Sequence, residues 1–144
     1  MHHSDEGIYF CWGAQHGLYE KNVIEDCNYG MTFGHSDSDN LIRDNDIRRS
    51  GEAGIHFRGG NKAFAPHRNR IERNRIVDSG AEKGVAIDIN GETESVVLMK
   101  NELRETRQPL SRIGILIGAE TRDIRCVENQ IEGFAVPISD LRKA

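Results

Sequence analysis

Apolar residues recur along the chain in pairs two positions apart, and polar or charged residues separate one pair from the next. Side chains two residues apart share one face of a β-strand, so each pair predicts a short strand with one buried face. No helix of useful length fits between these pairs. The pattern therefore predicts an all-β protein built from many short strands.

One motif, Asn followed two residues later by Ile or Leu, occurs five times at intervals of 23 to 29 residues. An apolar residue or cysteine stands three positions before each asparagine, and a charged residue stands directly before it. We expect the asparagine to lie at a tight bend in left-handed conformation, with its amide bonded to the asparagines above and below. The five are Asn22, Asn45, Asn74, Asn101 and Asn129.

A second motif is a glycine with apolar residues one and three positions later, and it alternates with the first. Each period thus holds a strand after glycine, a strand ending near asparagine and a third strand just after it. Equivalent strands in register predict a solenoid of about five turns, with three short parallel strands in each turn. The glycines are Gly7, Gly30, Gly54, Gly84 and Gly114.

The asparagine column, the Gly-apolar-x-apolar strand and the irregular period resemble the right-handed parallel β-helix of pectate-lyase-like proteins. The resemblance runs from Gly7 to about Ile138. It implies a single β-helix domain over residues 1–144, which stands alone or is a fragment or truncated relative of a longer β-helix. It also implies an extracellular or periplasmic location, although the start, MHHSDEG, lacks the apolar core of a signal peptide.

Composition narrows the range of partners. The net charge is −4, and arginines alternate with acidic residues, which argues against nucleic acid as a partner. No apolar run is long enough to cross a membrane. The three cysteines have no metal-ligand spacing, and we expect no metal site. Calcium stays open as a cofactor because Asp37 and Asp39 alternate in the stretch GHSDSDN, although a polar turn is the simpler interpretation.

The resemblance implies that substrate lies along the outer face of the sheet built from the glycine-led strands. Residues two and four positions after each glycine point outward. This places His56 and Arg58 on one face, with Thr32 beside His56 and Asp88 beside Arg58. Further candidates for substrate contacts on this face or overhanging it are Tyr9, His35, Lys62 and His67.

These side chains suggest proton abstraction beside a uronate carboxylate, followed by elimination. That chemistry needs a base and a cation to neutralise the carboxylate. We expect His56 or Lys62 as the base and Arg58 as the cation, in a carbohydrate-interacting module related to polysaccharide lyases. The one outward carboxylate, Asp88, argues against glycoside hydrolysis, which normally uses two.

The alternative is a non-catalytic module for adhesion or assembly, in which Arg58 and Asp88 form a cross-strand ion pair and His56 is an ordinary surface residue. The ends of the solenoid bear on this alternative. No capping helix precedes Ile8 and Phe10, so we expect exposed apolar surface there and self-association through uncapped ends. The C-terminal sequence ISDLRKA is expected to form a short polar cap.

Overall fold

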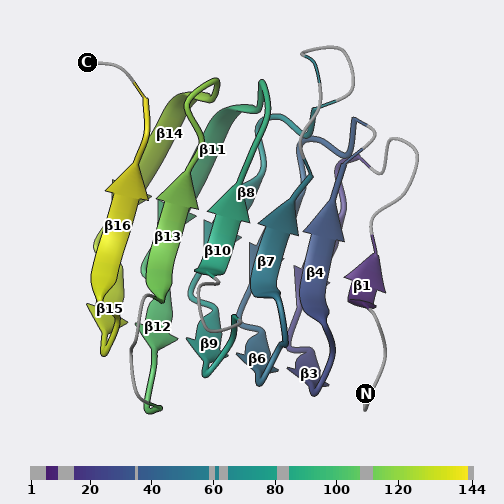
Figure 1. Ribbon diagram of the computed structural model, residues 1–144. Helices are drawn as coiled ribbons and strands as arrows, with labels where there is room; N and C mark the ends of the chain where they lie inside the picture. The colour runs from purple at the N-terminus through teal and green to yellow at the C-terminus, as the bar shows by residue number, and fades with distance from the viewer. Residues whose placement is uncertain are drawn as a thin grey trace.

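The computed structural model describes residues 6–9, 15–34, 36–58, 61, 65–80, 85–107 and 112–142. Within these ranges the chain forms sixteen strands and no helix. Sheet A is the six-stranded sheet seen in front in Figure 1. Its strands, in spatial order, are β1 (Glu6–Tyr9), β4 (Tyr29–Phe33), β7 (Ala53–Phe57), β10 (Val85–Ile89), β13 (Ile113–Ile117) and β16 (Val136–Asp140).

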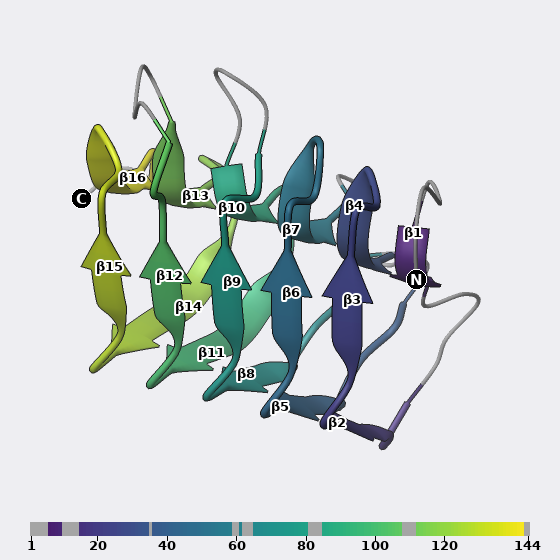
Figure 2. The same cartoon turned by 90° about the horizontal axis from the view of Figure 1, so that it is seen from below.

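Two five-stranded sheets complete the solenoid. Sheet B consists of β2 (Leu18–Glu20), β5 (Leu41–Arg43), β8 (Arg70–Glu72), β11 (Glu94–Met99) and β14 (Arg122–Val127). Sheet C consists of β3 (Val23–Glu25), β6 (Asp46–Arg48), β9 (Arg75–Val77), β12 (Glu102–Arg104) and β15 (Gln130–Glu132). In Figure 2 sheet C faces the viewer, with sheet A above it and sheet B below.

The chain visits sheets A, B and C in that order from β1 to β15, and β16 then adds a last strand to sheet A. The strand pairs that build the sheets are parallel, as in β4 with β7 and β11 with β14. The predicted class, an all-β parallel solenoid with three short strands in each repeat, is confirmed.

The core consists of stacked apolar side chains that the three sheets enclose. The residue two positions after each ladder asparagine forms one stack, in which Ile47, Ile76 and Leu103 are fully buried. Sheet A contributes a second stack, in which the rings of Phe33 and Phe57 lie parallel with centroids 4.8 Å apart. Both stacks were predicted from the two-residue apolar spacing.

The asparagine ladder is confirmed. Asn45 donates its side-chain Nδ2 to Asn74 Oδ1 at 2.9 Å, and Asn74 donates in turn to Asn101 at 3.2 Å. The amides of the last four asparagines also donate to a main-chain carbonyl of the preceding repeat, for example Asn74 Nδ2 to Ile42 O at 3.1 Å. These bonds satisfy polar groups that would otherwise be buried without partners at the bend between sheets B and C.

The prediction that asparagine itself adopts the left-handed conformation is wrong. The charged residue directly before it does so, with φ between 48° and 57°. The side chains of this column stand at an outer corner, and Arg73 bonds Asp44 of the preceding repeat at 3.2 Å. The left-handed backbone thus falls on a residue whose side chain is in solvent. The asparagine after it makes the hydrogen bonds of the ladder. The column is Lys21, Asp44, Arg73, Lys100 and Glu128.

The glycine column needs one correction. A side chain at Gly54 would put its Cβ 2.6 Å from Ile76 Cγ2 and 2.9 Å from Ala86 O, so the column requires a very small residue. In β10 this place belongs to Ala86 rather than Gly84, because Val85 pairs with Ala53. The strand β10 is therefore shifted by two residues from the predicted alignment.

The C-terminal sequence does not form the polar cap that was predicted for it. Residues 138–140 belong to strand β16, and the side chains of Val136, Ile138 and Leu141 are 40%, 42% and 54% exposed. A partial cover comes from Arg142, which bonds Asp140 and donates to the main-chain carbonyl of Ile124 at 3.3 Å. At the other end Ile8 packs against the core, and Phe10 lies outside the described residues.

Candidate functional site

A histidine and an aspartate meet on the outer face of sheet A. His56 on β7 lies in register with Asp88 on β10 and with Thr32 on β4. The distance from His56 Nδ1 to Asp88 Oδ2 is 3.0 Å. The predicted placement of Asp88 beside Arg58 is therefore wrong, and the cause is the two-residue shift of β10.

Both partners are held by further contacts. The second oxygen of Asp88 accepts a hydrogen bond from Asn90 Nδ2 at 2.7 Å. The ring of Tyr29 stacks on the His56 imidazole, with centroids 4.9 Å apart and planes 29° apart. The side chains of His56 and Asp88 remain 20% and 17% exposed. His56 Nε2 makes no hydrogen bond to any residue that the structure describes, so it is the ring nitrogen available to a ligand.

A cation follows two residues after His56 in the chain. Arg58 directly follows β7 and is half-buried. Its guanidinium lies against Gly34, where a Cβ would be 2.4 Å from Arg58 Nε. Any side chain at Gly34 would displace Arg58, so this glycine makes room for the cation. Thr32 is only 1% exposed, and its hydroxyl is therefore covered although it lies beside His56.

The remaining predicted site residues are not gathered on this face by the described structure. His35 and Lys62 lie outside the described residues, and of Tyr9 only the backbone is described, paired with Thr32. His67 lies on the connection from β7 to β8, where its Nδ1 accepts the main-chain N–H of Glu94 at 3.0 Å. That contact places His67 at the border of sheets A and B, away from His56.

The outer faces of sheets B and C carry charges that neutralise one another. On sheet B, Arg43 bonds Glu20 at 2.7 Å, and on sheet C, Arg75 bonds Glu102 at 3.2 Å. Such exposed pairs contribute little and are typical of a solvated surface. The His56 face differs because its polar groups converge on one ring.

The acids considered as calcium ligands have structural partners. Asp37 is fully buried, and its Oδ2 accepts the main-chain N–H of Gly34 at 3.0 Å. Asp39 bonds Arg68 at 2.8 Å, and this hydrogen bond lowers the pKa of the Asp39 carboxyl. Across the described ranges, no group of three or more His, Cys, Asp and Glu side chains is arranged to hold a metal ion.

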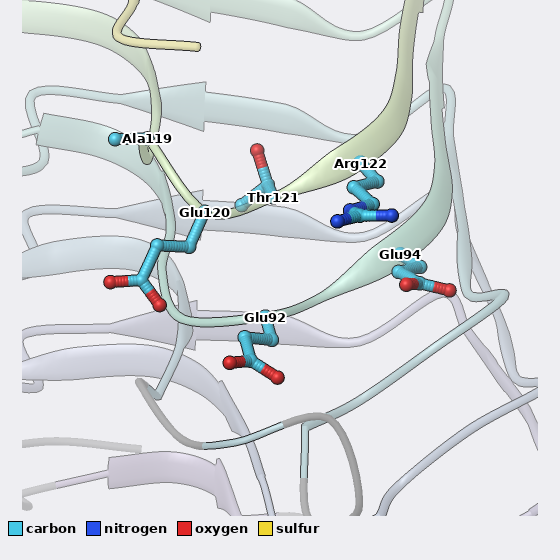
Figure 3. Close-up of a pocket in the computed structure, with 6 residues that line it drawn as sticks. All are labelled: Glu92, Glu94, Ala119, Glu120, Thr121 and Arg122. Atoms are coloured by element: carbon cyan, nitrogen blue, oxygen red, sulfur yellow. The ribbon is translucent and has the colours of Figure 1, made fainter. Parts of the chain in front are cut away.

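A hollow of about 340 Å³ lies at the connections from sheet A to sheet B near the C-terminal end. It was not predicted from the sequence. In Figure 3, Arg122 stands above Glu94, while Glu92 and Glu120 extend from neighbouring connections. Its charges are mostly acidic, so it does not suit an acidic sugar. The lining residues are Glu92, Glu94, Ala119, Glu120, Thr121 and Arg122.

Comparison with known proteins supports the architecture. The family model described as the right-handed β-helix region matches residues 6–136. No curated protein and no solved structure gave a match. Among the residues that the structure describes, there is no helix long and apolar enough to span a membrane. Because the family match covers most of its length, the chain belongs to the right-handed β-helix family.

Proposed function

We propose that the outer face of sheet A binds an acidic polysaccharide or oligosaccharide, and that the protein cleaves it as a uronate lyase. The observation that supports this proposal is the convergence of Asp88 and Tyr29 on His56, with Arg58 on the same strand end. A base and a cation on one accessible face are the two groups that elimination beside a carboxylate needs.

In this proposal His56 Nε2 removes the proton from the sugar carbon next to the carboxylate. The electron pair left behind forms a carbon–carbon double bond while the glycosidic carbon–oxygen bond breaks. The leaving oxygen takes up a proton from water, and His56 later releases its own. Arg58 pairs with the substrate carboxylate and stabilises the negative charge that develops on it. Lys62 remains a candidate for the base, and Tyr9 and His35 remain candidate substrate contacts. The covered hydroxyl of Thr32 and the place of His67 at the border of sheets A and B argue against substrate contacts from these two residues.

The test uses the ultraviolet absorbance of the unsaturated uronate product, measured on a panel of acidic polysaccharides with and without calcium. His56→Ala is expected to lower turnover by about 10²- to 10⁴-fold, the usual contribution of a positioned base. A matched control is His16→Asn, because His16 is exposed beside β2 and its left-handed backbone (φ 56°) suits asparagine.

The control should keep wild-type turnover, and both variants should keep the circular dichroism of the wild-type protein. Product formation by His56→Ala at the wild-type rate would contradict the assignment of the base. A flat absorbance trace across the whole panel would contradict the lyase proposal itself.

A second candidate function is a non-catalytic module for adhesion or assembly. It is favoured by the apolar side chains exposed along the last strand, Val136, Ile138 and Leu141. Sedimentation velocity at several protein concentrations tests it. Concentration-dependent association that is lost in Ile138→Asp would support this candidate, whereas a monomer at all concentrations would count against assembly through this end.

A further inference from the structure

Asp88 is held between two hydrogen-bond donors, one on each of its oxygens. Oδ2 lies 3.0 Å from His56 Nδ1, and Oδ1 accepts Asn90 Nδ2 at 2.7 Å. Asn90 is itself anchored, because the same amide nitrogen lies 3.3 Å from the main-chain carbonyl of Phe57. The carboxylate plane is therefore fixed from both sides.

This arrangement decides which nitrogen of His56 carries the proton. An ionised carboxylate can only accept hydrogen bonds, so the imidazole nitrogen that faces it must be the N–H. The neutral ring then holds its proton on Nδ1 and presents a lone pair at Nε2. Tyr29 stacks on the ring and hinders a flip that would put Cδ2 in the place of Nδ1 and turn Nδ1 away from Asp88.

We infer that Asp88 is a positioning residue that fixes the tautomer of His56, and that Asn90 orients Asp88. This inference rests on the proposed lyase function, and it replaces the expectation that Asp88 contacts the sugar. The substrate proton goes to Nε2, the electron pair goes to the new double bond, and the Nδ1 proton stays in its hydrogen bond to Asp88.

Because Asn90 donates to Asp88, the substitution Asp88→Asn should reverse the tautomer of His56. The side-chain N–H of Asn90 selects the oxygen of the new amide, so the NH₂ of that amide turns toward His56 Nδ1. Nδ1 must then accept a hydrogen bond, and the ring proton moves to Nε2. The lone pair that would act as the base is lost, although the shape of the site is unchanged.

A second substitution should reverse this effect in part. In the double variant Asp88→Asn with Asn90→Ala, nothing at position 90 selects the amide oxygen. The new amide can then rotate and present its oxygen to His56 Nδ1. The Nδ1–H tautomer is expected to recover, and turnover is expected to rise above that of Asp88→Asn alone.

The experiment is ¹⁵N NMR of the full chain labelled at histidine, with the His56 signals assigned by their loss in His56→Gln. The shifts distinguish a protonated ring nitrogen from an unprotonated one. The wild type should show a protonated Nδ1 and an unprotonated Nε2, and Asp88→Asn should show the reverse. The matched control is Asp46→Asn on the outer face of sheet C, where Asp46 bonds Arg48 and not a histidine.

Kinetics on the same variants separate positioning from sugar binding. Asp88→Asn is expected to lower kcat by on the order of 10²-fold or more with KM unchanged. A raised KM with unchanged kcat would overturn the inference, and so would an unprotonated Nδ1 in the wild type. The expected tautomers together with no turnover on any uronate polymer would refute the lyase proposal and leave the tautomer assignment supported.

Discussion

Replacing one asparagine of the ladder tests how the solenoid is held together. Asn74 is buried in the middle of the ladder, and its side chain takes part in four hydrogen bonds. Two are donated by Nδ2, to Ile42 O and to Asn101 Oδ1. Two are accepted by Oδ1, from the main-chain N–H and the side-chain amide of Asn45.

Asn74→Ala removes all four bonds and leaves one buried main-chain group, the N–H of Asn45, without a partner, whereas the carbonyl of Ile42 keeps its place in the ladder between β5 and β8. A hydrogen bond contributes about 0.5–1.5 kcal/mol net, and a buried orphan group costs about 1–3 kcal/mol. Allowing for relaxation and some overlap between these losses, the free energy of unfolding should fall by about 3–5 kcal/mol.

Asn22 provides the matched control within the same ladder. It is half-buried in the first repeat, and its side chain donates one described hydrogen bond, to Asn45 Oδ1 at 3.0 Å. Asn22→Ala should therefore lower the free energy of unfolding by about 0.5–1 kcal/mol. Urea unfolding followed by circular dichroism measures both variants. Equal losses for Asn22→Ala and Asn74→Ala would contradict this prediction, because the contribution of a ladder asparagine to stability would then not depend on its burial or on its number of hydrogen bonds.

Two further predictions concern the corners and the C-terminal end. Lys100 is exposed and has a left-handed backbone with φ 55°. Lys100→Gly should therefore preserve or raise the free energy of unfolding, whereas Lys100→Val should lower it by about 1–2 kcal/mol. The reverse order of the two variants in urea unfolding would contradict a left-handed corner. The hydrogen bond from Arg142 lowers the pKa of Asp140 from 3.8 to about 2. The folded pKa is below the unfolded one, so this pair stabilises the fold above about pH 4, and its contribution is lost as the pH falls toward 2. The urea midpoint should fall less steeply over that window in Asp140→Asn than in the wild type, and identical slopes would count against the pair.

The repeat could be predicted from the sequence because its strongest signals come from buried side chains. Ile47, Ile76 and Leu103 must point inward at every turn, and Asn74 must satisfy buried polar groups in the turns beside it. Both demands recur at the period of the coil and are visible as aligned columns. The left-handed residue at the corner could not be predicted because its side chain is in solvent. Lysine, arginine, aspartate and glutamate are all tolerated there, so no single residue type marks the position.

The site was predicted less well because a strand of alternating residues fits two registers. In β10 the residues Val85, Ile87 and Ile89 can all face inward, so a shift of two residues preserves both faces. The sequence favoured Gly84 as the counterpart of Gly54, but Ala86 is small enough for that place. The shift moves Asp88 from the neighbourhood of Arg58 to that of His56, and it turns an expected ion pair into a candidate base with its partner.

Mapping an acidic oligosaccharide onto the protein by NMR chemical shifts shows directly whether the outer face of sheet A is the binding site. We expect the largest shifts at the main-chain amides of His56, Arg58, Asp88 and Asn90, on the outer face of sheet A, and no saturable shifts from a neutral oligosaccharide of the same length. Saturable shifts confined to sheets B and C, or to the hollow at residues 92–94 and 119–122, would contradict the placement of the site on sheet A.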